Sequence, residues 1–507
     1  MKERSTTTGL YALAFCSVSA GMLSCGAEKK QAEEAKPNII YILADDMGCG
    51  DIRALNDSCR IPTPALDKMV ASGMTFTDAH SNSAVSTPTR YGTLTGRYAF
   101  RSRLKSGVLV GHDPALIETG RETVASLLKK NGYRTACVGK WHLGLNWARK
   151  DTTKPLYEGS PWDMSSTENV DYAARVGGGP ADCGFDFSYI IPASLDIAPY
   201  VYIRNGQVTA PATQHSEGWK SDEARGMWYR QGDVAADFKH DSCLQQLTQQ
   251  SIQYIREAGA SDQPFFLYFP LTAPHTPWLP AAEFRGKSGA GVYGDFVCMV
   301  DDVVRQIYQV LEETGQAENT LVIFTSDNGS HWLPTDVEQT RHRANGLYSG
   351  MKSDVWEGGH RVPYIATWPA GIQPGSRSAQ LLCSTDLMAT CAEMLGKELP
   401  SDAGEDSFSF WKALRSEPAD SAMRQNVIYH SIEGLFGFRQ GDWALLDCKG
   451  SGGWSLPEKD AKELPLMQLY NLKDDPTEKH NLLDTHADKV ATMKQILTKQ
   501  IENERSR

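Results

Sequence analysis

Carboxylate and amide side chains directly follow two apolar runs of the sequence. Asp45 and Asp46 come after one run, and Asp327 and Asn328 come after the other. Open α/β sheets bind ligands at the carboxyl ends of their strands, so we expect these side chains at one edge of a sheet. Three carboxylates and an amide oxygen form a hard donor set that suits Ca²⁺ or Mg²⁺ rather than a thiophilic metal. Taken alone, either acidic pair is equally typical of a helix cap or a turn.

Cations and proton donors follow other apolar runs. Lys140 and His142 come after the run 135–138, and His275 comes after the run 265–269. Lys352 lies further along the chain. Such groups can bind an anion and move protons during catalysis. A lone histidine is more often structural and a lone lysine solvated, so these residues indicate a site only if the fold brings them together.

The segment 86–97 combines a hydroxyl, a proline, an arginine and a closing glycine. We predict a short helix in which Pro88 takes the first helical position, Thr87 or Ser86 caps the start, and Gly96 ends it. Ser86 then lies where backbone N–H groups and the helix dipole favour an anion. Arg90, one turn along, can point its guanidinium toward the same place. A capped surface helix without function is the alternative.

Apolar runs with helical stretches between them predict an α/β fold. Buried strands are expected at 39–43, 135–138, 265–269 and 321–324, and helices at 123–131, 241–258 and 295–314. Residues 146–232 lack periodicity and are expected to form a long excursion, either bordering a site or decorating the surface. From about residue 403, short β-like pieces at 426–430, 437–447 and 467–471 precede a helical segment at 486–504. They predict a smaller C-terminal α+β subdomain.

The first residues are expected to be a targeting signal rather than part of the folded protein. Lys2 and Arg4 precede an apolar stretch too short to span a bilayer as a mature helix, which is typical of a signal peptide. Residues 22–25 resemble a bacterial lipobox, in which Cys25 is lipidated. We therefore predict a lipoprotein signal at 1–24, a tether at 25–36, a catalytic domain at 37–402 and the subdomain at 403–507. A simple cleaved signal with an incidental cysteine is the alternative.

Composition excludes several classes of protein. The 507 residues are 41% hydrophobic and 22% charged, which indicates an ordinary globular protein. A net charge of −11 argues against a general affinity for nucleic acid or anionic membranes, so the expected contact with a membrane is through a lipid anchor only. Beyond Cys25, nine cysteines without CxxC pairs argue against a zinc site or a dense disulfide framework, and their odd number leaves at least one unpaired.

Taken together, these motifs resemble the formylglycine-dependent sulfatases of the arylsulfatase type. The family's signature Cys/Ser-x-Pro-x-Arg, followed by Leu-Thr-Gly-Arg, is matched at Ser86, Pro88, Arg90 and 94–97. Other family motifs are matched in order along the chain at 45–51, 139–144, 326–329, 350–352, 357–363, 469–472 and 481–482. The resemblance covers roughly residues 37–485.

The resemblance implies a fold, a modified residue and a metal. The fold is a large mixed sheet between helices, as in the alkaline phosphatase superfamily, with an antiparallel sheet in the C-terminal subdomain. Ser86 is implied to be oxidised to Cα-formylglycine by an anaerobic-type sulfatase-maturing enzyme. The implied metal is Ca²⁺, held by Asp45, Asp46, Asp327, Asn328 and an oxygen of the modified residue 86.

The resemblance also implies roles for the basic residues. The hydrated aldehyde attacks sulfur, and Arg90 with the metal favours its alkoxide. Lys140 and Lys352 stabilise charge on the sulfuryl oxygens. His142 removes a proton from the remaining hydroxyl, which expels sulfate and restores the aldehyde. We choose His275 as the acid that protonates the leaving alcohol, because it follows a different strand and can stand opposite the nucleophile.

The expected substrate is a sulfated glycan that carries a galactose or N-acetylgalactosamine sulfate, met by an exported enzyme in the periplasm or on the outer membrane. Some polar residues in loop-like regions could form hydrogen bonds with sugar hydroxyls: His112, His215, His331, Arg341 and Arg343. One alternative is a phosphate or phosphonate monoester hydrolase of the same superfamily, although a second metal-ligand set is not obvious. The other is a glycan-binding surface lipoprotein without catalysis, although every matched catalytic position is intact.

Overall fold

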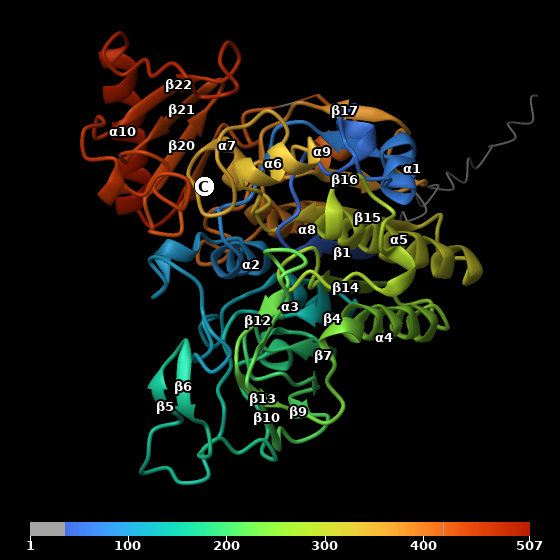
Figure 1. The fold of residues 1–507 in the computed structure, drawn as a ribbon. Helices are drawn as coiled ribbons and strands as arrows, with labels where there is room; N and C mark the ends of the chain where they lie inside the picture. The colour runs from blue at the N-terminus through green and yellow to red at the C-terminus, as the bar shows by residue number, and fades with distance from the viewer. Residues whose placement is uncertain (1–35, 419) are drawn as a thin grey trace, which may run out of the picture. The chain divides into compact units, whose positions relative to one another are not determined.

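The computed structural model describes residues 36–418 and 420–507, and a ten-stranded mixed sheet forms its centre (Figure 1). The strand order is β17-β2-β16-β15-β1-β14-β4-β7-β8-β9. In that order the strands are Ser376–Ser378, Met74–Phe76, Tyr364–Thr367, Thr320–Ser326, Asn38–Ala44, Phe265–Pro270, Arg134–Lys140, Phe187–Ile191, Ile203–Arg204 and Gln207–Val208. The four predicted strands are therefore confirmed as β1, β4, β14 and β15, which are parallel neighbours.

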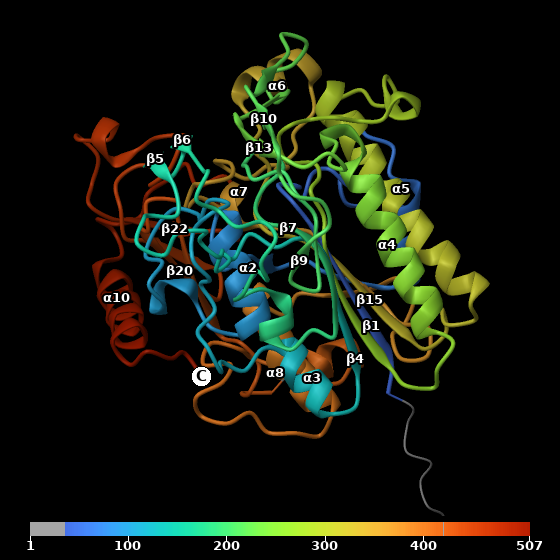
Figure 2. The same cartoon turned by 90° about the horizontal axis from the view of Figure 1, so that it is seen from below.

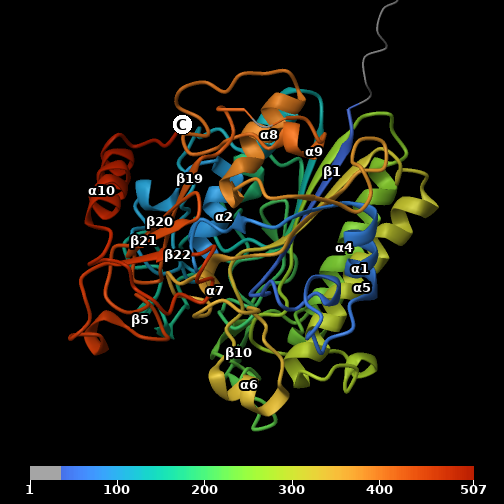
Figure 3. The same ribbon diagram turned by 90° about the horizontal axis from the view of Figure 1, so that it is seen from above.

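Helices cover both faces of this sheet. The helices α1 (Pro64–Ser72), α4 (Cys243–Ala258) and α5 (Gly291–Glu313) lie on one face, and α2 (Ser86–Thr95), α3 (Val124–Lys130) and α8 (Leu387–Met394) lie on the other (Figures 2 and 3). The three predicted helices are confirmed as α3, α4 and α5. Because both faces are covered, β1 is buried along its length after Asn38, which explains its continuous apolar sequence.

The start of α2 differs from the prediction. The helix begins at Ser86 itself, after an extended Val85 that provides no side-chain cap, so Pro88 is the third helical residue rather than the first. The Ser86 hydroxyl does not cap the helix because it is bonded to residues of other elements. The predicted end is confirmed, because Gly96 takes the left-handed conformation at the C-cap with φ +62°.

A separate antiparallel sheet forms near the C-terminus. It contains β19 (Asn426–His430), β20 (Phe436–Gln440), β21 (Trp443–Leu446) and β22 (Gln468–Asn471), and α10 (Ala487–Glu502) packs on it. The predicted piece 437–447 is therefore a hairpin of two strands, turned at Gly441. Residues 36–507 group as one compact unit, and the boundary at 402/403 stays a prediction.

The predicted excursion 146–232 is only partly outside the central sheet, because β7, β8 and β9 lie within it and extend that sheet. Most of the rest consists of short paired strands. The pairs are β5 (Glu158–Ser160) with β6 (Asp163–Ser166), β10 (Gln214–Ser216) with β13 (Gly232–Val234), and β11 (Trp219–Lys220) with β12 (Trp228–Tyr229). Smaller elements complete the architecture: β3 (Ala79–His80), β18 (Leu382–Cys383), α6 (Pro334–Thr340), α7 (Glu357–His360) and α9 (Trp411–Leu414).

The first residues of the chain cannot be compared with their prediction. The predicted signal peptide, Cys25 and all but the last residue of the tether lie outside the described residues. Within 36–418 and 420–507, no helix is both long and apolar enough to cross a membrane. The nine cysteines of the described residues are all free.

Candidate active site

The carboxyl ends of the central parallel strands carry the predicted catalytic side chains. Asp45 follows β1, Asp327 follows β15, and Lys140 is the last residue of β4. Because these strands run in the same direction, their ends meet at one edge of the sheet. All three side chains are completely buried there. The sequence-based expectation that they lie together is confirmed by their contacts.

Ser86 lies in the middle of this cluster. Its Oγ donates to Asp45 Oδ1 at 3.3 Å and accepts from Lys140 Nζ at 3.3 Å. Lys140 Nζ also donates to both carboxylate oxygens of Asp45 at 2.8 Å. Burial opposes the charge of Asp45, but Lys140 and the neighbouring cations outweigh it and lower the pKa of Asp45 to about 2. Asp45 is therefore a carboxylate throughout the physiological range.

Arg90 joins two of the strand ends. Its Nε and Nη2 donate to Asp327 Oδ2 at 3.1 and 2.7 Å, and Nη2 also lies 3.3 Å from Asp45 Oδ1. Its Nη1 donates to the carbonyl of Lys140 at 3.0 Å. Burial opposes the guanidinium charge, yet Asp327 and Asp45 raise the pKa of Arg90 above its ordinary value. Arg90 thus holds the acidic residues and the end of β4 in a fixed arrangement.

The acidic residues and Asn328 fit a hard cation. Asp46 accepts from Lys352 Nζ at 2.7 Å and from Asn328 Nδ2 at 2.7 Å, and its backbone N–H donates to Asp327 Oδ1 at 3.1 Å. Asn328 Oδ1 is buried and has no hydrogen-bond partner among residues 36–418 and 420–507. A buried carbonyl-type oxygen beside carboxylates is an unused ligand for Ca²⁺ or Mg²⁺. The donor set therefore fits the metal that the motifs predicted.

Charge balance at this edge also favours a cation and an anion together. The side chains of Asp45, Asp46 and Asp327 carry three negative charges, and those of Arg90, Lys140 and Lys352 carry three positive ones. Burial lowers the pKa of Lys140. Burial acts in the same direction on Lys352, but Asp46 and Asp45 outweigh it and raise its pKa. A bound divalent cation would leave an excess of positive charge for an anionic substrate.

The two predicted catalytic histidines have different surroundings. His142 Nε2 lies 2.8 Å from the carbonyl of Leu109, which can only accept, so Nε2 carries the proton. Its Nδ1 is buried without a partner. Burial, reinforced by Lys140 and Arg90, holds the pKa of His142 well below its usual range, so the ring is neutral. Its bare Nδ1 can accept a proton.

His275 is oriented by the loop after β14. Its Nδ1 donates to the carbonyl of Thr276 at 2.6 Å, which leaves Nε2 facing Asp46 Oδ2 at 3.7 Å. Single ligand-type atoms of Asp45, Asp46 and His275 lie within 4.8 Å of one another. Ca²⁺ prefers oxygen ligands, so His275 would remain available for proton transfer beside the carboxylates of Asp45 and Asp46.

Two further side chains at the site were not predicted. Ser194 Oγ lies 3.2 Å from Lys140 Nζ and 3.4 Å from His275 Nδ1. Asp196 Oδ1 lies 3.8 Å from His275 Nδ1 and has no hydrogen-bond partner. Both follow β7, which is parallel to β4. They therefore lie at the same edge of the sheet as the other residues of the site. Recognising the apolar run 187–191 as a strand would have found them.

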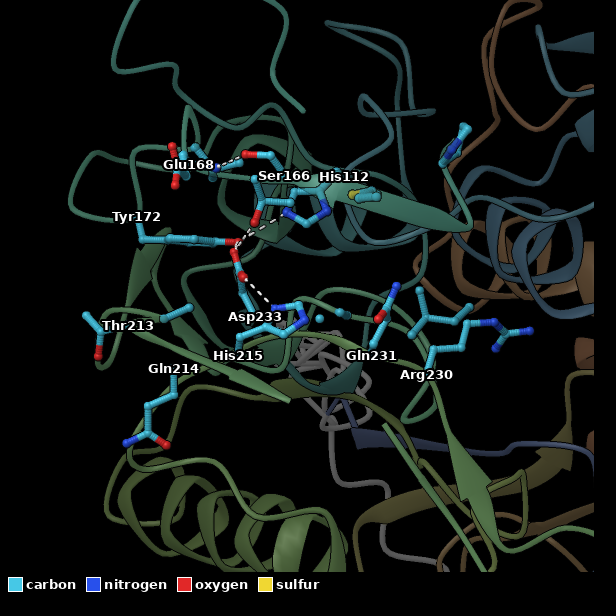
Figure 4. Close-up of a pocket in the computed structure, with 18 of the residues that line it drawn as sticks. His112, Ser166, Glu168, Tyr172, Thr213, Gln214, His215, Arg230, Gln231 and Asp233 are labelled. Atoms are coloured by element: carbon cyan, nitrogen blue, oxygen red, sulfur yellow. Dashed lines mark hydrogen bonds and ion pairs between the residues drawn. The ribbon is translucent and has the colours of Figure 1, made fainter. Parts of the chain in front are cut away.

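The five residues predicted to bind the substrate lie in three different places. His112 and His215 line one cavity (Figure 4). The rings of His331 and Trp454 are tilted relative to each other with centroids 4.9 Å apart, and Lys352 Nζ lies 5.9 Å from the Trp454 ring centroid. Burial and the nearby cations lower the pKa of His331 to about 3.

Arg341 and Arg343 are exposed on the loop after α6. Among residues 36–418 and 420–507, neither side chain forms a hydrogen bond or ion pair with the carboxylate cluster. Instead, the buried His342 between them bonds Asp51 at 2.7 Å. The structure therefore does not bring Arg341 and Arg343 to the predicted site, because the loop is anchored by His342 and directs its neighbours outward.

Comparisons with known proteins agree with this fold. The family model described as Sulfatase matches residues 37–397. An N-acetylgalactosamine-6-O-sulfatase of Bacteroides thetaiotaomicron is 31% identical over 500 residues, with 91% of this chain and 92% of that relative covered. Human arylsulfatase A is 30% identical over 469 residues, covering 88% of this chain and 83% of that relative.

A solved structure from work on the metabolism of multiple glycosaminoglycans by Bacteroides thetaiotaomicron has a TM-score of 0.78 and is 28% identical. It covers 92% of this chain and 99% of that chain. The chain therefore belongs to the sulfatase family, within the alkaline phosphatase superfamily. It is an enzyme that hydrolyses sulfate esters.

Proposed function

We propose that this sulfatase hydrolyses an O-sulfate of a carbohydrate, namely a galactose or N-acetylgalactosamine sulfate of a sulfated glycan. Similarity to an N-acetylgalactosamine-6-O-sulfatase over nine-tenths of the chain supports the substrate class. The observation that carries the reaction is the position of Ser86, whose Oγ lies 3.3 Å from both Asp45 and Lys140 in a fully buried cluster.

Ser86 is proposed to be converted to formylglycine by an anaerobic-type sulfatase-maturing enzyme. The hydrated aldehyde would supply a nucleophilic oxygen and a second hydroxyl whose deprotonation releases sulfate without attack by water. Asp45, Asp46, Asp327 and Asn328 would hold Ca²⁺, or Mg²⁺ in its place. The metal would supply Lewis acidity for charge on the substrate oxygens.

The residues of the chain perform the remaining functions. Lys140 and Lys352 bind the sulfuryl oxygens, because each holds a buried ammonium group against one of the adjacent carboxylates. His142 accepts a proton at Nδ1, since Nε2–H is committed to the Leu109 carbonyl. His275 donates a proton from Nε2 to the leaving sugar oxygen, which has too high a pKa to leave as an alkoxide.

The cellular setting belongs to the same proposal. Export through the predicted signal peptide, with Cys25 lipidated, would place the enzyme in the periplasm or on the outer membrane, where it meets extracellular glycans. Contact with the membrane would be through the lipid alone. Mass spectrometry of the N-terminal peptide from its native host tests this part, and an unlipidated chain would contradict it.

The reaction is tested by sulfate release. Protein produced with a Ser-type maturing enzyme and supplied with Ca²⁺ should release sulfate from one regioisomer in a panel of sulfated galactose and N-acetylgalactosamine. Release from sulfated phenols but from none of the sugars would contradict the substrate class. Phosphate release that exceeds sulfate release would favour a phosphate or phosphonate monoester hydrolase.

A further inference from the structure

A cavity of about 440 Å³ lies beside the catalytic centre and is lined by none of its residues. Its walls come from the loop carrying His112, from β6 and from the strand pair β10 and β13 (Figure 4). The volume is within the range of pockets that bind small organic molecules. Neither Ser86 nor any of the catalytic lysines or histidines lines it, so a ring that occupies it cannot also carry the ester.

Two paths of contacts connect the cavity to the catalytic histidines. Arg230, in the cavity wall, forms an ion pair with Asp196, and Asp196 Oδ1 lies 3.8 Å from His275. On the other side, His142 bonds the carbonyl of Leu109, and the same loop continues to His112 in the cavity wall. The leaving sugar must lie beside the acid His275, and Asp196 links His275 to the cavity wall, so the glycan chain can extend toward this cavity.

The hydrogen bonds around His112 leave one of its ring nitrogens as an unused acceptor in the cavity wall. Tyr172 Oη donates to the Asp233 carboxylate at 3.0 Å, so it accepts from His112 Nε2 at 3.2 Å. His112 Nδ1 therefore carries no proton, and within the described part of the chain it is buried without a hydrogen-bond partner. Burial lowers the pKa of His112 to about 4, so the ring stays neutral. Such a nitrogen is an acceptor for a ligand hydroxyl.

The rest of the wall suits an uncharged sugar. Lys150 and Arg230 are balanced by Glu168 and Asp233, so the lining carries no excess charge for an anion. Trp162 is 49% exposed at the cavity, with the Arg230 guanidinium 5.0 Å from its ring centroid. An exposed aromatic ring held in place by an arginine can pack against the apolar face of a sugar ring.

We propose that this cavity binds the neutral sugar linked to the sulfated one, so that the enzyme prefers an oligosaccharide to a sulfated monosaccharide. The inference rests on the proposed function, because it takes the leaving group to be a sugar. His112 and Trp162 contact the second ring, and His215, 3.6 Å from Asp233, binds its hydroxyls.

The test compares a sulfated monosaccharide with a disaccharide that carries a neutral hexose next to the same sulfated sugar. Trp162→Ala and His215→Ala are expected to lower the ratio of kcat/KM for the disaccharide to that for the monosaccharide at least fivefold, through KM. The control His480→Ala removes another exposed histidine paired with an aspartate, at 3.4 Å, on the C-terminal subdomain. It should leave the ratio unchanged.

An unchanged ratio in both cavity variants would overturn the inference, whether both substrates weaken equally or neither does. Calorimetry with the unsulfated disaccharide galactosyl-N-acetylgalactosamine separates this result from a failure of the proposed function. If no sulfated sugar is turned over but wild type binds this probe and Trp162→Ala does not, the cavity site stands and the reaction fails. Equal binding by wild type and Trp162→Ala, or binding by neither, would remove the cavity site itself.

Discussion

Two buried arginine–aspartate pairs of this protein have similar donor–acceptor distances but different neighbours. Arg90 contacts Asp327 at 2.7 and 3.1 Å, and Arg424 contacts Asp386 at 2.5 and 2.8 Å. Around Arg424, the remaining donors are met by Tyr98, Thr385 and backbone carbonyls. Around Arg90, a buried amide oxygen and an imidazole nitrogen lack partners. Complete pairing indicates a structural role, whereas unused ligand atoms indicate a site that binds something else.

The largest difference between the two regions is expected for Ser86→Ala. Alanine cannot be oxidised to formylglycine, so sulfate release should fall at least about a thousandfold. The melting temperature should change little, because the hydrogen bonds of the Ser86 hydroxyl to Asp45 and Lys140 are long, at 3.3 Å each. Activity within about tenfold of wild type would refute the nucleophile. Ser86→Cys, matured by a Cys-type enzyme, is the matched variant that should retain activity.

Arg424→Met tests the structural side of the comparison. Removing one member of a buried ion pair leaves Asp386 uncompensated, which should lower the free energy of unfolding by about 3–5 kcal/mol. Denaturant unfolding measures this loss. The fraction that remains folded should keep wild-type kcat, because Arg424 touches none of the catalytic residues. If Arg424→Met lowered kcat but left the free energy of unfolding unchanged, the Arg424 cluster would not be separate from the Arg90 cluster.

His275→Ala separates proton transfer from the rest of the site. A sugar alkoxide needs a proton to leave, whereas 4-nitrophenolate does not, so sulfate release from a sugar sulfate should fall about 100-fold more than from 4-nitrophenyl sulfate. Comparing kcat/KM of wild type and variant on both substrates measures the difference. Equal losses on the two substrates would remove His275 from the role of acid.

Metal removal should change stability as well as activity. A cation present at about 100 times its Kd adds about 2.7 kcal/mol to the stability of the folded state. Chelation by EDTA should therefore lower the melting temperature and the activity, and added Ca²⁺ should restore both. Asp327→Asn should lose the response to Ca²⁺. A melting temperature insensitive to both treatments would contradict the metal site.

The sequence predicted the catalytic edge well because its rules are local. Apolar strands followed by polar residues placed Asp45, Lys140 and Asp327 together, and their contacts confirm it. The cap of α2 was predicted wrongly because the Ser86 hydroxyl is taken by Asp45, 41 positions away, rather than by its own helix. Long-range competition of this kind leaves no mark in the local sequence.

The cavity walls lie beyond local prediction for a related reason. They use strands of three or four residues in the excursion 146–232 and just after it, which have no periodicity of their own. His112 and His215 were selected only as polar residues in loops. The fold brings them together through Asp233, which neither spacing nor composition indicates.

The most direct test of the account is sulfate release from N-acetylgalactosamine 6-sulfate and its galactose counterpart by protein whose residue 86 has been checked by mass spectrometry. We predict that protein with formylglycine at position 86 releases sulfate in the presence of Ca²⁺, and that protein with unmodified Ser86 does not. Equal release by both forms, or none from any sulfated sugar by the modified form, would contradict the account.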